Sequence, residues 1–265
     1  GTKSAGSIIG HKKTVWKDLN KLSMKGKIIE NFLNIPWLII SWILAYKGYY
    51  FLAFPFSVIY FLTTLRQVHN GIHNSLGLNK NNTRLSLLIN SIFMSVSASA
   101  IKFNHLRHHK YNLSEEDYEG ITATMKWYQA ILYGPVFMFN IHLNTIKKGN
   151  SIYRKQLFLE TIFIIIFVFI AIYFKIHFLI YHIIVMMFFE GLMAFFAVWA
   201  VHHDTEENPE FPRTQRGAGW KSFISADMFF HLEHHLFPSI PTHNLKEVSK
   251  RLDENFPELD KKNVF

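Results

Sequence analysis

The chain has 265 residues, of which 49% are hydrophobic, 16% aromatic and only 18% charged, a composition that excludes an intrinsically disordered chain and a highly solvated surface. Cysteine is absent, which excludes disulfides, thiolate zinc sites, cysteine nucleophiles and a cysteine-held iron–sulfur cluster within this chain. The 28 basic and 19 acidic residues leave a net charge of +9. Beside long apolar segments, such an excess is typical of cytoplasmic loops, and we expect no nucleic-acid partner.

Four nearly uncharged runs dominate the middle of the chain. Residues 11–30, which precede them, are polar and basic and predict a cytoplasmic lead-in able to form an amphipathic helix on the membrane surface. Each run approaches the roughly 20 residues that cross about 30 Å of hydrocarbon. Lys47–Gly48 and Lys175 are the short turns within two helical hairpins. The predicted spans are approximately residues 31–47, 48–68, 157–175 and 176–201.

The segments between and after the spans are more polar. Residues 84–103 can be read as a fifth span, but we prefer an interfacial or half-buried helix, because the segment is rich in Ser and Asn. Residues 121–146 predict a second membrane-surface helix, and a charged helix is expected from Thr242 onward. The fold class is therefore all-α: one multi-pass domain over residues 1–265, with four transmembrane helices, interfacial helices and a cytoplasmic histidine-rich cap.

The distribution of basic residues predicts the orientation. Lys and Arg flank the outer ends of the two hairpins far more often than their short turns. By the positive-inside rule, both termini and all large loops, including residues 69–155 and 202–265, lie in the cytoplasm. Every histidine cluster then faces that side. The expected location is the plasma membrane of a bacterium or the endoplasmic reticulum of a eukaryote.

Histidine is the most informative residue type, because most of the 15 copies form four clusters. Spacings of three and four residues place side chains on one face of a helix. The triplet His-x-x-His-His occurs twice, and a His-x-x-x-His pair and a histidine at the end of the last span accompany it. The predicted metal ligands are His69, His73, His105, His108, His109, His202, His231, His234 and His235.

Nine ligands are too many for one tetrahedral ion, so the sequence predicts two ions. Imidazole suits iron, zinc, copper or nickel. The carboxylate-rich pattern of soluble di-iron bundles is absent from the sequence, so a di-iron site here would consist almost entirely of histidine. A histidine-lined metal transporter is a distant alternative, since transporters place ligands near the bilayer midplane and these ligands follow the ends of spans.

The order of these motifs resembles that of the integral-membrane fatty acid desaturase and hydroxylase superfamily. HLEHHLFPSIPTHNL (231–245) is similar to the last histidine box of that family, and HLRHHKYN (105–112) to its middle box. AVHHD (200–204) stands where the family has a further ligand, and aligning the span end favours His202 over its neighbour. The resemblance covers roughly residues 31–245.

The resemblance implies an O2-dependent di-iron oxidoreductase that removes hydrogen from an unactivated C–H bond of a fatty-acyl or related lipid chain. Introduction of a double bond is the expected outcome, and a hydroxylase or ketolase acting on a fatty-acyl, alkane or carotenoid substrate is the alternative. Val198 stands where some acyl-CoA desaturases have Asn, and the first box has three intervening residues rather than four. Acyl-lipid desaturases, hydroxylases and carotenoid-modifying relatives therefore remain open.

Other residues are expected to support this chemistry. Ligand imidazoles need partners for their second nitrogen, and the candidates are His203, Asp204, Glu233, Asp117, Asp227, Asn70, Asn74 and Asn104. A carboxylate within a span faces a cavity or the bundle interior, so Glu190 is a candidate for the substrate channel, together with Trp199, Phe195 and Phe196. The isolated histidines are expected to be structural or interfacial: His11, His142, His177, His182 and His243.

Electrons are expected to come from a separate protein. The sequence has no cysteine for an iron–sulfur cluster and no glycine-rich dinucleotide fingerprint. We expect a ferredoxin, rubredoxin or cytochrome b5-type donor at the cytoplasmic face, attracted by Lys110, Lys147 and Lys148.

Overall fold

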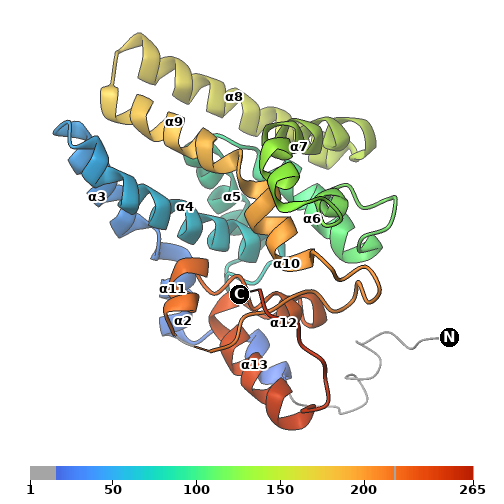
Figure 1. The fold of residues 1–265 in the computed structure, drawn as a ribbon. Coiled ribbons are helices and arrows are strands. Elements are labelled where there is room, and N and C mark those ends of the chain that lie inside the picture. The colour runs from blue at the N-terminus through green and yellow to red at the C-terminus, as the bar shows by residue number, and fades with distance from the viewer. Residues whose placement is uncertain (1–15, 218, 265) are drawn as a thin grey trace.

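The computed structural model describes residues 16–217 and 219–264, which form helices joined by loops (Figure 1). In chain order the elements are η1 Lys17–Asn20, α2 Met24–Phe32, α3 Ile35–Tyr46, α4 Tyr50–Ile72, α5 Lys80–Met94, α6 Ala98–Tyr111, η2 Glu119–Thr122, α7 Trp127–Lys148, α8 Ser151–Tyr173, α9 His177–Glu190, the π-helical η3 Ala194–Trp199, α10 Ala200–His202, α11 Gly219–Ser225, α12 His231–Leu236 and α13 Thr242–Asn255. Within the described ranges the only strand-type pairing is an isolated bridge between Thr214 and Asn263. The predicted all-α class is confirmed, and so is the helix from Thr242.

Four helical segments are long and apolar enough to cross a membrane, which confirms the predicted number. They are Met24–Tyr46, Tyr50–Ile72, Ser151–Tyr173 and His177–His202. The first and third begin six or seven residues before the predicted spans, because a helix starts at its cap and not where charges stop. The side chain of Asn150, for example, accepts hydrogen bonds from the backbone N–H groups of Ile152 and Tyr153.

The spans form two helical hairpins, α3–α4 and α8–α9, which extend to the same end of the molecule (Figure 1). The first hairpin turns at Gly48, whose φ of 82° is a left-handed conformation that glycine adopts without steric cost. The second turns at Lys175, with a φ of 51°. Helix α9 packs against α3 and α4, so the two hairpins share one apolar core.

Residues 84–103 do not form a straight span. Helix α5 ends at Met94 and is capped by Ser95, which has a left-handed φ of 58°. Helix α6 begins after Ser97, whose hydroxyl accepts a hydrogen bond from the N–H of Ala100. The two helices meet at a bend of 110°. This geometry directs α6, with its three histidines, away from the path of α5.

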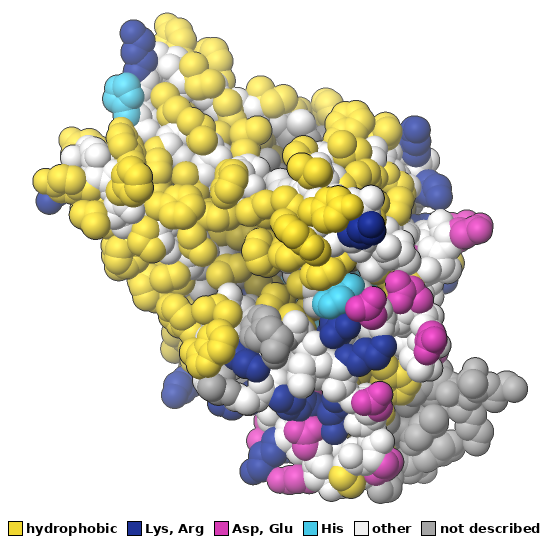
Figure 2. All heavy atoms as spheres, viewed as in Figure 1, with side chains coloured by type: hydrophobic (Ala, Val, Ile, Leu, Met, Phe, Trp, Pro, Cys, Tyr) yellow, Lys and Arg dark blue, Asp and Glu magenta, His cyan; other side chains and the backbone are white. Residues whose placement is uncertain are grey.

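Polar and apolar surfaces are separated along the molecule. Figure 2 shows hydrophobic side chains covering the long hairpins, whereas charged side chains gather at the opposite end. That end contains α2, α11, α12 and α13 (Figure 1), with a small second core around Leu245, Val248 and Leu252. The histidine-bearing helix ends lie between these two regions.

Candidate metal centre

All nine predicted ligands lie together in the structure. His69 lies in the last turn of α4 and His73 directly follows that helix, whereas His202 ends α10. The middle triplet lies on α6 and the last triplet on α12. Each helix end therefore presents one histidine cluster to the same interior space.

The first group of possible metal ligands consists of His69, His73, His105 and His234. One imidazole nitrogen from each ring lies within 4.8 Å of those of the others. The Nε2 atoms of His73 and His105 are 3.1 Å apart, and the ring centroids of His69 and His234 are 4.1 Å apart. This arrangement brings together residues from α4, α6 and α12.

The second group consists of His108, His202, His231 and His235, again with nitrogens within 4.8 Å of one another. The Nε2 atom of His202 is 2.9 Å from that of His108 and 2.9 Å from that of His231. The Nε2 atoms of His235 and His231 are 3.1 Å apart. His202 thus connects the end of the last span to both triplets.

His109 lies between the two groups. Its Nε2 atom is 2.8 Å from that of His234 and 3.1 Å from that of His105. Its ring centroid is also 4.5 Å from that of His235, a member of the second group. By its nitrogen contacts, His109 lies closer to the first group, although it belongs to neither set of four.

The helix that ends in His202 is locally irregular. Residues Ala194–Trp199 are π-helical, a form that occurs mostly as short insertions at functional sites. Just before this segment, α9 passes so close to α7 that a methyl group on Gly134 would overlap the carbonyl oxygen of Gly191. This close contact between α7 and the end of α9 fixes where the π-helical segment begins. The segment leads directly into α10, which ends at His202.

The donor set fits metal ions. His105 and His108 place Nδ1 2.8 Å from a Glu119 oxygen and 2.6 Å from an Asp117 oxygen. Because a carboxylate accepts a proton-bearing Nδ1, each of these rings presents the lone pair of Nε2 to the interior. Several Nε2 atoms converge there at 2.8–3.1 Å. Converging lone pairs repel one another unless cations lie between them.

Burial keeps most of these rings uncharged. Burial, with the positive charge of Lys102 nearby, lowers the pKa of His73 to about 2. Burial likewise lowers the pKa values of His234 and His235 well below the usual value. Neutral imidazole is the form that binds metals.

His108 behaves differently. Burial alone lowers its pKa, but the hydrogen bond to Asp117 and the charges of Glu119 and Asp117 together raise it. The same hydrogen bond lowers the pKa of Asp117 although burial opposes this. Asp117 also accepts hydrogen bonds from the backbone N–H groups of Leu113 and Gly120. These backbone hydrogen bonds hold the Asp117 carboxylate in place, and the carboxylate in turn orients the His108 ring.

Comparison with known proteins identifies the family. A family model described as fatty acid desaturase matches residues 41–262. The chain belongs to the fatty acid desaturase family. The matched range contains all nine clustered histidines and three complete candidate spans. Searches of curated proteins and of solved structures found no significant match.

This membership, with the four apolar helices, makes the chain an integral membrane oxidoreductase of the desaturase and hydroxylase type, acting on fatty-acyl chains. The four apolar helices provide the lipid-facing surface. The two groups of histidines able to hold metal ions lie where these helices end. Sequence similarity alone indicates such a centre. The structure also shows which histidines belong to each of the two groups.

Several predicted hydrogen-bond partners of the ligands lie in connecting networks. Asn70 donates a 2.7 Å hydrogen bond to Glu30 and accepts two from Thr242. Asp227 pairs with Arg66 at 3.2 Å. These bonds connect α4 to the segments on either side of α12. The predicted contacts of Asn70 and Asp227 with ligand histidines stay predictions.

Two other predicted partners of the ligand histidines form hydrogen bonds to neighbouring segments, and a third is exposed. Glu233 is buried and bonded to Thr214 and Arg216. Asn104 donates to the carbonyl oxygen of Ile141 and accepts from Asn144, and so joins α6 to α7. Asn74 is exposed directly after the first histidine box.

His203 and Asp204 follow the predicted ligand His202. The His203 ring stacks on Trp199, with centroids 4.0 Å apart and an interplanar angle of 5°, and its Nδ1 is 2.9 Å from the Trp199 carbonyl oxygen. Asp204 is exposed and 3.3 Å from Arg213. His203 does not belong to either group of possible ligands in the part of the chain that the structure describes.

The candidate channel residues occupy the last span. Glu190 is buried, and neither carboxylate oxygen has a hydrogen-bond partner among the described residues. Phe195 stacks on Trp199 at 5.1 Å, whereas Phe196 is 51% exposed. Their contact with substrate stays a prediction.

The remaining histidines lie outside the two groups. His142 is bonded to the carbonyl oxygen of Met138 and His182 to that of Phe93. His177 is the first residue of α9, and His243 is the second residue of α13. His11 lies outside the described residues. One partner was not predicted from the sequence: Glu119, which is hydrogen-bonded to His105 from 14 residues away. The acidic residues that follow the middle box were the available indication.

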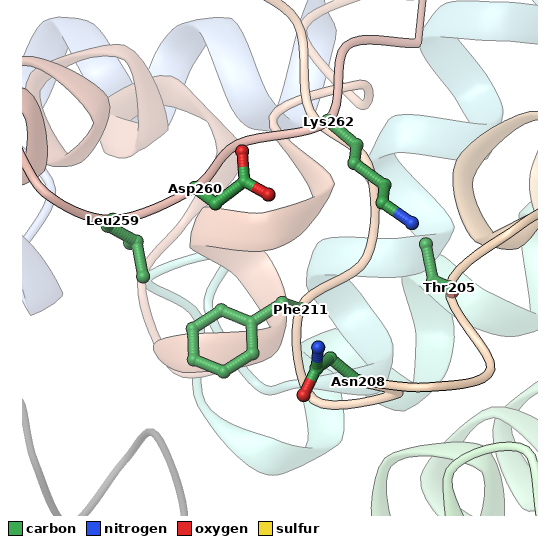
Figure 3. Close-up of a pocket in the computed structure, with 6 residues that line it drawn as sticks. All are labelled: Thr205, Asn208, Phe211, Leu259, Asp260 and Lys262. Carbon is green, nitrogen blue, oxygen red and sulfur yellow. The ribbon is translucent and has the colours of Figure 1, made fainter.

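The C-terminal segment lies beside the loop that follows His202. A hollow of about 190 Å³ lies between the loop and the segment. Figure 3 shows the residues that line it: Thr205, Asn208 and Phe211 from the loop, and Leu259, Asp260 and Lys262 from the segment. The Nζ atom of Lys262 also donates a hydrogen bond to the backbone carbonyl oxygen of Asp204. The segment therefore holds the loop against the end of the last span.

Removing the charge of Asp117 should weaken metal binding. In Asp117→Asn, we expect the affinity of the second group to fall about 10- to 100-fold, as is typical when a hydrogen-bond partner of a ligand histidine is lost. Competition with a chelator measures this. Glu116→Gln is the matched control, since Glu116 is exposed and pairs with Arg107. Equal metal retention in both variants would contradict the assignment.

Proposed function

We propose that the protein is an O2-dependent di-iron oxidoreductase that introduces a double bond into a fatty-acyl chain. The observation that carries this proposal is the convergence of nine histidines, eight of which form two adjacent groups of four with His109 between them. Their coordinating atoms are nitrogen throughout, and the family oxidises fatty-acyl chains. The substrate is a lipid chain within the same membrane.

The identity of the metal follows from the required chemistry. Imidazole also suits zinc, but zinc has no redox chemistry, whereas the family reaction is an oxidation. When bound, two iron ions would supply the reduction of O2 that removes hydrogen from an unactivated methylene. His105 and His108, held by Glu119 and Asp117, would be oriented ligands of different ions.

The chain itself supplies positioning and exclusion of water. His108, His202, His231 and His234 are buried, so water has little access to their nitrogens. Fixed ring orientations hold the metal site rigid while the substrate carbon is brought near it. A small difference in the placement of that carbon decides between loss of a second hydrogen and return of oxygen as a hydroxyl.

The orientation and the donor complete the proposal. We place the histidine region on the cytoplasmic side, by the positive-inside rule. Lys110, Lys147 and Lys148 are exposed, and Lys110 and Lys148 project from helices that flank the acidic loop after the middle box. They would attract an acidic ferredoxin, rubredoxin or cytochrome b5-type donor.

The function is tested with purified protein reconstituted in phospholipid vesicles with iron, O2 and a reduced donor protein. We expect two iron ions per chain by metal analysis and Mössbauer spectroscopy, and an acyl product that has lost two hydrogen atoms. A product that has gained one oxygen atom would instead establish the hydroxylase alternative. Full turnover with NAD(P)H and no donor protein would refute the separate donor, and full activity without iron would refute the di-iron proposal.

A further inference from the structure

A second hollow lies next to the metal centre. It has a volume of about 360 Å³, within the range of small-molecule sites. One wall comes from residues 123–128, which precede and begin α7. The other wall contains Trp199, His203, Asp204 and Glu206, at and after the end of the last span. Because His203 directly follows His202, this hollow begins one residue from the second group of histidines.

The hollow lies at the border of the lipid-facing surface. Trp199 is three residues before the end of the span His177–His202. On the other wall, Trp127 is 56% exposed, and α7 continues with exposed apolar side chains such as Leu132 and Phe139. Trp and Tyr are enriched where a membrane meets water. On the face in Figure 2, histidine, acidic and basic side chains also gather at the edge of the hydrophobic surface.

Aromatic rings form much of the lining. Trp127, Tyr128 and Trp199 all contribute to it. The indole N–H of Trp199 donates a 2.7 Å hydrogen bond to the Met125 carbonyl oxygen, and the ring is stacked on His203. Trp199 is therefore held in place before any ligand binds. Tryptophan and tyrosine faces attract cations, and quaternary ammonium groups are the usual ligands of aromatic cages.

Charged groups of both signs complete the lining. Lys126 comes from the α7 wall, whereas Asp204 and Glu206 come from the loop after the last span. Arg213 partly neutralises Asp204 at 3.3 Å. Glu206 forms no ion pair with any residue within 16–217 and 219–264. The hollow thus offers carboxylates beside Trp199 on one wall and an amine beside Trp127 and Tyr128 on the other.

We propose that this hollow binds the zwitterionic headgroup of a phospholipid. The ammonium group lies against the rings of Trp127 and Tyr128 and the carboxylate of Glu206, and the phosphate faces Lys126. This inference rests on the proposed function and deepens it: the oxidised chain is carried by an amine-bearing phospholipid, so that its glycerol ester begins beside the second group of histidines.

Headgroup binding is tested by native mass spectrometry of the iron-loaded protein in detergent. The probes are phosphatidylcholine, phosphatidylethanolamine and phosphatidylglycerol with identical acyl chains. We expect the two amine-bearing lipids to be retained about tenfold better than phosphatidylglycerol. Glu206→Lys should erase this preference, because it places a positive charge at the ammonium position. Glu207→Lys is the matched control with the same charge change beside the hollow, and it should keep the preference.

A second pair of variants tests the aromatic wall. Trp127→Ala should lower retention of phosphatidylcholine by about threefold or more, as loss of a cation–π contact predicts. Trp220→Ala, which removes a tryptophan that is 59% exposed on α11, should not. Equal retention of the three lipids by the unaltered protein would overturn the proposal, and so would equal effects of Glu206→Lys and Glu207→Lys.

Turnover in vesicles of each lipid separates this inference from the proposed function. Selective binding of amine-bearing lipids without any oxidised chain would leave the headgroup site standing and refute the di-iron desaturase. Equal oxidation of chains in all three lipids, by both the unaltered protein and Glu206→Lys, would support the enzyme and refute the headgroup site.

Discussion

His202→Ala is expected to abolish acyl-chain oxidation, while His203→Ala leaves the iron content intact. The Nε2 atom of His202 lies 2.9 Å from the Nε2 atoms of both His108 and His231. The neighbouring His203 ring is stacked on Trp199 and lies outside both groups of possible ligands. The two substitutions remove the same side chain from adjacent positions, so they compare a proposed ligand with its neighbour.

The expected loss of turnover for His202→Ala exceeds about 100-fold, because removing a ligand should cost more than the 10- to 100-fold typical of its hydrogen-bond partners. Iron per chain should fall in His202→Ala and remain at two in His203→Ala. Metal analysis and Mössbauer spectroscopy measure this after size-exclusion chromatography has selected folded protein. Iron loss from His203→Ala with full iron in His202→Ala would reverse the assignment of the ligand.

The transmembrane helices could be predicted because lipid excludes charge and unpaired backbone groups alike. Uncharged runs therefore indicated four helices and both turns. Their ends could not be predicted in the same way. The third span begins at Ser151 and includes Arg154 and Lys155 in its first turns, because the Asn150 cap determines the start. The bend at Ser95 also depends on tertiary packing, since serine has no intrinsic preference for a left-handed conformation.

The histidine spacing predicted a shared face but not how each triplet would be divided. On α6, His105 and His109 contact one another through Nε2, whereas His108 belongs to the other group. On α12, His231 and His235 share a group and His234 joins the other. At about 100° per residue, positions i and i+4 differ by about 40°, whereas i+3 points about 60° the other way. One triplet can therefore contribute to two ions.

Residues that connect segments distant in the sequence were the hardest to predict. Glu30 and Arg66 lie 36 residues apart, and neither belongs to a histidine motif. In the structure Arg66 contacts Glu30 through Nε at 3.0 Å and through Nη2 at 2.7 Å. Glu30 also accepts hydrogen bonds from Asn70 and from the backbone N–H of His243. One buried carboxylate thus joins α2, α4 and α13.

Glu30→Ala is expected to destabilise the protein by about 3–5 kcal/mol, since it leaves the buried Arg66 guanidinium without its main partner. For a chain of this size, the midpoint of thermal unfolding should fall by on the order of 10 °C. Unfolding of the iron-loaded protein in one detergent measures the shift. Glu254→Ala is the control, because Glu254 forms an exposed pair with Lys250 at 4.0 Å, and such pairs contribute only about 0.3–0.5 kcal/mol.

The double variant Glu30→Leu/Arg66→Met separates the cost of an unpaired charge from the value of the pair itself. Replacing a buried pair by apolar residues of similar volume is often neutral or stabilising, so the double variant should unfold at a higher temperature than Glu30→Ala. Asp227 would lose its partner Arg66, but its side chain is 28% exposed and can be solvated. A double variant no more stable than Glu30→Ala would show that the bonds to Asn70 and His243, rather than the ion pair, hold α4 and its histidines to α13.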